Sequence, residues 1–367
     1  MQRLESLDVF RGLTIAGMIL VSTPGTWDAV YPQLEHAAWD GSTLADLVFP
    51  FLLFAMGAAV PFALARRRDR QSVRRHVVRR AAILFPLGLI LNVIETAPPL
   101  SLATFRLPGV LQRIALVYLA VSWLTERTST RTQIAAALGA LLGYWAVITL
   151  VPVPGCDMPT LSAECNIGSF IDRLVFGRHM LYPAWDPEGL LSTVPAIATA
   201  LFGVFAGDWL NAPSARHRTL TLFAAGTVAV LVALVWDVVF PINKSLWTSS
   251  FALFTAGLAA QALAACHWLL DVRHWRAWSQ PFIAFGRNPL AGYFLSVGSD
   301  SVLTRWTVSA GPEPASLKAF LYQMLFASWL GRCGGADAAS LGYALAYVAL
   351  WALVLGEMHR RRIYIGI

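Results

Sequence analysis

A histidine and an aspartate stand ten residues apart at the start of an apolar segment, and these two residue types together form general-base pairs. His36 lies in a stretch of aromatic and polar residues, and Asp46 falls one turn into a helix predicted to begin at Ser42 or Thr43. A carboxylate that holds one imidazole nitrogen leaves the other free to accept a proton near neutral pH. The spacing fits a second interpretation equally well, in which Asp46 only caps the helix and His36 is solvated.

Ionisable and amide side chains also interrupt other apolar segments. Such side chains are costly in hydrocarbon, so they usually face the interior of a helix bundle or a water-filled cavity. Asp8 and Arg11 share one helix face and are spaced to pair with each other. The other interrupting residues are Gln112, Arg113, Arg287 and Asn288. Pro289 predicts a break in its helix, and broken helices are tolerated at membrane depth where they line a cavity.

Two acids, Asp186 and Glu188, begin a further apolar segment. They either cap that helix, because carboxylates are favourable at a helix N-terminus, or bind a cationic or polyhydroxylated ligand. The sequence has no zinc-ligand spacing, no Walker loop and no dinucleotide-binding glycine pattern. We therefore expect no metal in the site.

The elements that position these residues are predicted to be membrane-spanning helices. The chain has 367 residues, of which 57% are hydrophobic and 13% charged, whereas soluble domains carry about 25% charged residues. We predict an all-α integral membrane bundle of about ten spans, forming one domain over residues 1–367. The predicted spans are Leu7–Val21, Leu44–Ala65, Ala81–Ile94, Gly109–Leu124, Ile134–Val151, Leu190–Leu210, Leu220–Phe240, Thr248–Leu270, Phe282–Leu303 and Ala338–His359. Ala315–Leu330 is short and amphipathic, as is typical of a helix on the membrane surface.

The distribution of positive charge predicts the orientation. Of the 28 Lys and Arg residues, eighteen fall on one side of the predicted membrane, many of them in a loop from Arg66 to Arg80, seven fall on the other side, and three lie inside spans. Cytoplasmic loops of membrane proteins collect Lys and Arg, so both termini are predicted to be cytoplasmic. This rule also accounts for the net charge of +7, and we expect no nucleic-acid partner.

Cys156 and Cys165 lie close together in the longest predicted outer loop. In a bacterial cytoplasmic membrane, that face is oxidising. We therefore predict a Cys156–Cys165 disulfide, although Cys333 also faces outward and is a competing partner. Cys266 lies at membrane depth, where a free cysteine packs as a small apolar residue.

Six sequence blocks follow one another between residues 6 and 290. They are Ser6–Leu13, His36–Pro50, Pro108–Arg113, Asp186–Ser192, Pro241–Trp247 and Gly286–Leu290. In this order they resemble the heparan-α-glucosaminide N-acetyltransferase family and its bacterial relatives, which belong to a wider group of transmembrane acyltransferases. The resemblance implies acetyl transfer from cytoplasmic acetyl-CoA, across the bacterial inner membrane, to an amino sugar or related glycan on the periplasmic side. It also suggests a homodimer.

The resemblance places the family's active-site histidine on His36 and the acid that follows it on Asp46. One position departs from the pattern, because Ser22 stands where the family often has an Asn in a Val-Asn-Asn-Pro-Gly stretch. If that Asn polarises the thioester, Ser22 does so more weakly or not at all.

The chemistry of CoA predicts where the donor lies. Its anionic nucleotide end should meet the Arg-rich cytoplasmic face, since the guanidinium fork binds phosphate bidentately, and its narrow arm should reach toward His36. We predict the phosphates near Arg79, Arg80 and Arg287, with Asn288 beside the arm. The full predicted donor set is Ser22, Arg79, Arg80, Gln112, Arg113, Arg287 and Asn288. The predicted acceptor set is Trp39, Asp186, Glu188, Asn243 and Lys244.

Two alternatives remain open for the residues and the reaction. A helical bundle with polar groups at membrane depth also suits an inner-membrane transporter of N-acetylglucosamine or a similar amino sugar. Within the enzyme hypothesis, His36 either accepts the amine proton during direct transfer or is itself acetylated first. We favour direct transfer, because a membrane cavity can hold both substrates at once.

Overall fold

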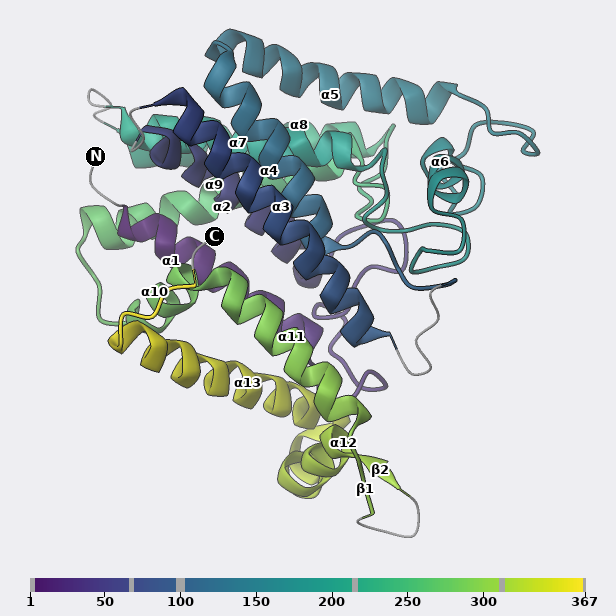
Figure 1. The fold of residues 1–367 in the computed structure, drawn as a ribbon, viewed down its shortest axis with the longest axis vertical. Coiled ribbons are helices and arrows are strands. Elements are labelled where there is room, and N and C mark those ends of the chain that lie inside the picture. Colours follow the sequence, from purple (N-terminus) through teal and green to yellow (C-terminus); the bar gives the residue numbers. More distant parts are fainter. Residues whose placement is uncertain (1–3, 66–68, 97–102, 213–216, 310–313, 366–367) are drawn as a thin grey trace.

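The computed structural model describes residues 4–65, 69–96, 103–212, 217–309 and 314–365, which form a bundle of α-helices (Figure 1). The α-helices are α1 (Glu5–Ser22), α2 (Leu44–Ala65), α3 (Arg70–Glu95), α4 (Val110–Arg127), α5 (Thr130–Leu150), α6 (Ile167–Phe176), α7 (Thr193–Asn211), α8 (Arg218–Asp237), α9 (Ser249–His267), α10 (Gln280–Arg287), α11 (Pro289–Arg305), α12 (Leu317–Tyr322) and α13 (Leu330–Arg360). Trp268–Val272 and Gln323–Ala327 are π-helical. β1 (Thr307–Val308) and β2 (Ala315–Ser316) pair antiparallel.

Seven helices in the described residues are long and apolar enough to cross a membrane, namely α2, α3, α5, α7, α8, α9 and α13. The other three predicted spans correspond to α1, α4 and α11, which are shorter or more charged. α1 and α4 have 18 residues each and carry three charged residues each, and α11 has 17 residues. The chain is thus an all-α membrane protein, and the count of ten crossings stays a prediction.

Three local features differ from the sequence prediction. The Arg-rich stretch predicted as a loop is helical from Arg70 onward, because Asp69 caps α3 by accepting a hydrogen bond from the Ser72 amide; Arg66–Arg68, like Arg3 and Arg216, lie outside the described residues. The long outer loop contains a helix, α6, that was not predicted. The ninth predicted span is divided into α10 and α11.

The break between α10 and α11 falls at Asn288 and Pro289, as predicted from the proline. α10 packs directly against α1, and two glycines permit this close approach. A Cβ on Gly12 would lie 1.8 Å from the carbonyl oxygen of Phe282, and one on Gly286 would lie 1.8 Å from that of Asp8. The contact places the charged residues of α1 beside the helix break.

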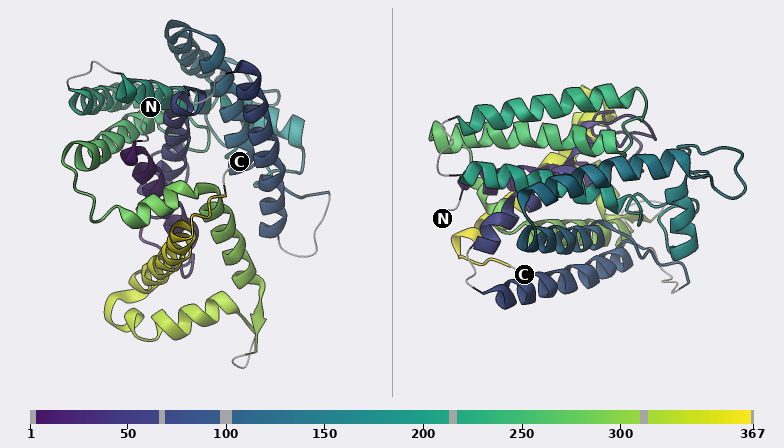
Figure 2. Two further views of the ribbon diagram at one scale, coloured as in Figure 1. Left: turned by 60° about the vertical axis from the view of Figure 1, so that its left-hand side comes forward. Right: turned by 90° about the horizontal axis from the view of Figure 1, so that it is seen from above.

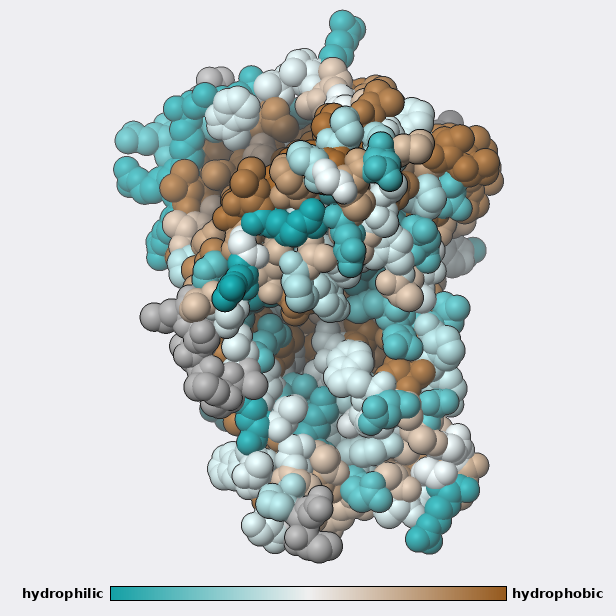
Figure 3. All heavy atoms as spheres, turned by 90° about the vertical axis from the view of Figure 1, so that its right-hand side faces the viewer, coloured by the Kyte–Doolittle hydropathy of each residue, from teal (hydrophilic) through white to brown (hydrophobic). Residues whose placement is uncertain are grey.

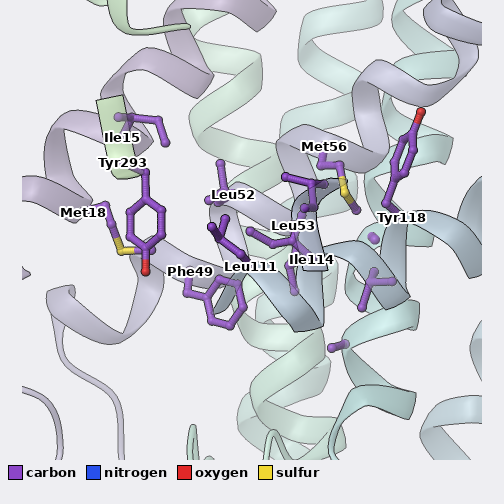
Figure 4. Packing of buried hydrophobic residues seen from close by; sticks show 14 of the residues in the cluster. Ile15, Met18, Phe49, Leu52, Leu53, Met56, Leu111, Ile114, Tyr118 and Tyr293 are labelled. Atoms are coloured by element: carbon purple, nitrogen blue, oxygen red, sulfur yellow. The ribbon is translucent and has the colours of Figure 1, made fainter. Parts of the chain in front are cut away.

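Buried apolar side chains of α1, α2, α4 and α11 form the centre of the bundle (Figure 4). Leu53 of α2 and Ile15 of α1 are 0% and 1% exposed. Figure 4 shows Ile15 and Tyr293 facing the row of Leu52, Leu53 and Met56 on α2. This centre also surrounds the cavity described below.

The two ends of the bundle differ in character. The N-terminus, the start of α1 and the end of α13 lie at the left of Figure 1, whereas α6 and the long loops lie at the right. The two views of Figure 2 show the same separation. The right-hand end, which we call the outer end, carries hydrophilic residues around a hollow near its middle (Figure 3). His36 and Asp46 both belong to this end.

Candidate active site

His36 and Asp46 meet at the outer end of α2. The Nδ1 atom of His36 is 2.9 Å from Oδ1 of Asp46. The Asp46 side chain is fully buried, whereas the His36 side chain is 51% exposed. A carboxylate in this position orients an imidazole and stabilises its protonated form, while the exposed ring can still meet a substrate.

The second oxygen of Asp46 caps the helix, in addition to the contact that Oδ1 makes with His36. Oδ2 accepts hydrogen bonds from the backbone amides of Thr43 and Ala37, at 3.0 and 3.1 Å, and from the Thr43 hydroxyl at 3.1 Å. An acid that reaches back to the amide at the helix start forms one half of a capping box. The bonds at the helix start therefore hold the Asp46 carboxylate in the orientation in which Oδ1 contacts His36.

Lys244 completes this cluster from the loop between α8 and α9. Its Nζ atom lies 3.2 Å from Oδ1 of Asp46 and 2.9 Å from Nδ1 of His36. The loop is held in place by its backbone, since the Gly41 amide donates to the Ile242 carbonyl at 2.7 Å. The Asn243 side-chain amide donates to Asp40 at 3.1 Å. Asn243 and Lys244, predicted to bind the acceptor, are thus engaged with the His36 loop and with Asp46.

A second charged cluster lies on the same outer end. Arg106 donates from Nε and Nη2 to the two carboxylate oxygens of Asp186, at 2.9 and 2.6 Å, and also contacts Glu188. The Asp186 side chain is fully buried and that of Glu188 is 8% exposed. The two predicted acceptor-binding acids therefore share one cation, Arg106, which the sequence prediction did not include.

Arg113 and Trp247 join the two clusters. Arg113 is 1% exposed and donates to the Gly189 carbonyl at 3.1 Å and to the Ser192 hydroxyl at 2.5 Å. Its guanidinium lies over the Trp247 ring, 5.0 Å from the ring centre. Trp247 has a positive φ of 51°, which is unusual for a bulky residue. Arg113, predicted to bind the donor, lies at the outer end beside Gly189 and Ser192, next to the acids predicted to bind the acceptor.

Trp39 is connected to the disulfide loop. The predicted pairing of Cys156 with Cys165 is present, and Leu161 lies inside the loop that it closes. The indole NH of Trp39 donates to the Leu161 carbonyl at 3.0 Å, and the ring meets Trp185 edge to face at 5.1 Å. The disulfide therefore holds one wall of an aromatic cluster three residues after His36.

A cavity of about 440 Å³ opens between α1, α2, α3, α4 and α11. Asp8, Arg11 and Arg80 line it at the end nearer the N-terminus, and its remaining lining is mostly apolar, including Leu52, Met56 and Tyr293 (Figure 4). Arg11 also donates to the Gly286 carbonyl at 3.2 Å. The predicted pairing of Arg11 with Asp8 is present, with 3.9 Å between Nη1 and Oδ1, and a charge within an apolar segment is the signal for a residue that lines a cavity.

The other predicted donor-binding residues have different surroundings. Arg79 is exposed on α3, and Ser22 is the last residue of α1. Gln112 donates to the Leu107 carbonyl at 3.1 Å. Arg287 contacts the Tyr364 hydroxyl at 3.1 Å, and Asn288 pairs through its side chain with the backbone of residues 363 and 365. Among the predicted donor-binding residues, Arg80 is the one that lines the cavity.

Asp172 of α6 bonds to the segment that follows Asp186 and Glu188, and the sequence analysis did not predict this residue. Its Oδ1 accepts the Leu190 amide at 2.8 Å, and a Cβ on Gly189 would lie 2.0 Å from its Oδ2. Burial raises the pKa of Asp172 to about 6. The signal for α6 was Asn166, which caps the helix by accepting from the Ser169 amide.

The raised pKa of Asp172 makes stability depend on pH. When an acid has a higher pKa in the folded protein than in the unfolded chain, the folded protein is relatively more stable at pH values below the pKa of the unfolded chain. This stability is lost as the pH rises through the pKa of the folded protein. Relative to Asp172→Asn, the wild-type protein should lose about 2 kcal/mol of stability between pH 4 and pH 7. Thermal unfolding in detergent at both pH values measures this difference. Asp157→Asn, at an exposed acid of the same outer loop, is the control, and an equal pH response in all three proteins would contradict the prediction.

Comparison with known proteins gives an independent view of the chain. A family model described as a domain of unknown function, DUF5009, matches residues 3–155. Heparan-alpha-glucosaminide N-acetyltransferase of Homo sapiens is 31% identical over 351 residues, which cover 79% of this chain and 52% of the human protein. The protein of the same name from Mus musculus is 30% identical over 351 residues, covering 79% and 53%. The chain spans about half the length of these relatives. Over 79% of its length, it is a homologue of the heparan-alpha-glucosaminide N-acetyltransferases.

Proposed function

We propose that this protein is a transmembrane acetyltransferase that moves an acetyl group from cytoplasmic acetyl-CoA to the amine of an amino sugar on the periplasmic side of the bacterial inner membrane. The observation that carries the proposal is the hydrogen bond between half-exposed His36 and buried Asp46 at the outer end of α2. The inner part of the same helix lines the cavity. The homology to proteins named as N-acetyltransferases supports acetyl transfer.

The charged and apolar lining of the cavity suits the two parts of the donor. Arg11 and Arg80 line the end that we assign to the cytoplasm, where they would meet phosphate groups of CoA. The apolar remainder would hold the pantetheine arm. Leu52, which lines the cavity, is six residues from Asp46 along α2, a rise of about 9 Å. The arm therefore has to extend past the cavity, beside Phe49, to bring the thioester to His36.

The reaction needs one base and no external energy source, because a thioester is already activated. The bound ammonium first releases a proton to water; the free amine nitrogen then attacks the thioester carbonyl carbon, a C–N bond forms, and the C–S bond breaks. His36 accepts the proton that the nitrogen loses and returns it to the departing sulfur, which leaves as the CoA thiol. Proton transfer of this kind contributes about 10²- to 10⁴-fold to a rate. Asp46 holds the ring throughout.

The aromatic and acidic groups of the outer end would bind the acceptor. Trp39 and Trp185 meet edge to face, and Tyr182 stacks on Trp185 at 4.5 Å. Such rings present apolar faces with polar edges, which suits a sugar ring. Glu188, at the edge of the Arg106 cluster, is the acid that would attract a protonated amine. We further propose ten crossings with both termini in the cytoplasm, which puts this surface outside.

Purified protein in detergent tests the proposal through acetyl-CoA binding, measured by calorimetry, and acetylation of glucosamine, measured by mass spectrometry. Arg80→Met should weaken acetyl-CoA binding about tenfold, the size expected when one charge-assisted contact is lost. Arg79→Met, at the adjacent exposed residue, should leave it unchanged. Protein that neither binds nor hydrolyses acetyl-CoA, yet moves N-acetylglucosamine into liposomes, would be a transporter and would overturn the proposal.

A further inference from the structure

The position of the Lys244 ammonium relative to the His36 ring is unusual. Its Nζ atom lies 2.9 Å from Nδ1 and 3.2 Å from Nε2. These two nitrogens flank a single ring carbon, so a group near both of them without clashing with that carbon lies over the face of the imidazole. The lone pair of Nε2 lies in the ring plane and therefore remains available to a substrate.

The same ammonium is paired with the acid that holds the ring. Nζ of Lys244 is 3.2 Å from Oδ1 of Asp46, and Nδ1 of His36 is 2.9 Å from that same oxygen. One fully buried carboxylate thus faces two groups that can carry positive charge. If both were charged, the cluster would hold two cations and one anion, and the cations would be in contact. Like charges at this distance disfavour the second protonation.

The charged groups around the cluster are few. Glu35 and Asp40 belong to the His36 loop itself, and Asp40 is engaged by the Asn243 side chain. Burial lowers the pKa of Lys244 below its ordinary value, more than the carboxylates of Asp46 and Glu188 raise it, and Arg113 lowers it further. Loss of the ammonium would leave a buried carboxylate without its cation, which is costly. The ion pair therefore favours a charged Lys244 and an uncharged His36.

We propose that Lys244 is a positioning residue that keeps His36 unprotonated at neutral pH, by neutralising Asp46 and by placing a positive charge over the imidazole. Asp46 alone would favour the imidazolium form, which cannot accept a proton. With Lys244 present, Asp46 can orient the ring without making it permanently charged. This inference rests on the proposed function and deepens it, because it explains how His36 can accept a proton although Asp46 is bonded to its ring.

Titration of His36 by chemical modification tests the proposal without any enzyme assay. Diethyl pyrocarbonate modifies only the unprotonated imidazole, and mass spectrometry of the His36 peptide reports its rate at each pH. In Lys244→Met, the midpoint of this pH curve should rise by roughly one unit or more, the size expected when a neighbouring charge is removed. Lys244→Arg, which keeps the charge, should stay near the wild-type midpoint.

Two controls separate the proposal from a loss of structure. Lys318→Met removes a lysine with a 9% exposed side chain that is paired with Asp300 at 2.9 Å, and it should leave the His36 midpoint unchanged. His179, the other outward histidine, serves as an internal reference in every sample. An unchanged midpoint in folded Lys244→Met would overturn the proposal, whether or not the protein transfers acetyl groups.

A double variant keeps the test decisive if Lys244→Met does not fold. Lys244→Met with Asp46→Asn removes both charges, so its midpoint should lie near that of the wild type. Asp46→Asn alone retains the lysine charge and should give a lower midpoint than the double variant. Equal midpoints in these two proteins would show that Lys244 does not act on His36, and would equally overturn the proposal.

Discussion

His36→Ala is expected to lower acetyl transfer by about 10²- to 10⁴-fold, the range over which a positioned base acts. The substitution removes the group that accepts the proton lost by the attacking nitrogen and returns it to the departing sulfur. Acetyl-CoA binding should remain near normal, because the charged end of the donor would lie beside Arg11 and Arg80 at the opposite end of the bundle. Transfer measured by mass spectrometry and binding measured by calorimetry separate the two effects.

His179→Ala is the matched control for this prediction. His179 is the other histidine predicted to face outward, and its ring bonds to the Phe105 carbonyl at 2.9 Å. Its loss should leave the transfer rate within a few-fold of wild type. Incubation with radiolabelled acetyl-CoA and no acceptor should leave no stable label on His36 if transfer is direct. Full activity in the His36 variant would remove this residue from the reaction.

Arg106→Met is expected to destabilise the outer end of the molecule by about 3–5 kcal/mol, the usual cost of removing one partner from a buried ion pair. Asp186 and Glu188 would then both lack the guanidinium with which they pair. The backbone amides of Leu181 and Glu188 also bond to Asp186, so the segment that carries the acids should shift. A lower thermal unfolding midpoint and loss of transfer should appear together.

Arg173→Met provides the comparison for the Arg106 prediction. Arg173 lies on α6 in the same region but donates to a backbone carbonyl, that of Ala184, at 2.9 Å. Its removal should cost about 1 kcal/mol, as for one ordinary hydrogen bond. Adding Asp186→Asn and Glu188→Gln to Arg106→Met should restore part of the lost stability, since no buried charge then lacks a partner. Equal destabilisation by Arg106→Met and Arg173→Met would contradict the role given to the ion cluster.

The sequence predicted most of the helices because a long uninterrupted apolar segment is stable in hydrocarbon only when its backbone groups bond to one another along a helix. The division at Pro289 followed from the proline itself. The ten residues of α6 were missed, because a short amphipathic helix in a polar loop gives no hydrophobic run. The prediction of a loop from Arg66 to Arg80 was partly wrong. Charged residues continue a helix readily once a cap such as Asp69 has started it.

The site was less predictable than the fold, because its contacts join distant parts of the chain. His36 and Asp46 are ten residues apart, and their spacing allowed a contact without requiring one. Lys244 is 208 residues from His36, and a backbone bridge between Gly41 and Asn243 brings them together. No local pattern encodes such a pairing. Arg106 was overlooked because its acids were interpreted as helix caps or ligand-binding groups.

The bridge between Gly41 and Asn243 joins an early part of the chain to a late one, so the residues of the site are not all synthesised at the same time. The chain is synthesised from its N-terminus, so His36 and Asp46 are made early, within the segment matched by the DUF5009 model, residues 3–155. The lysine that contacts them follows only after α8. A nascent or truncated chain that ends before this point carries the histidine and its acid without their cation. Under our proposal, such a chain lacks the charge that keeps His36 unprotonated, so its histidine would be a poorer base than that of the full chain.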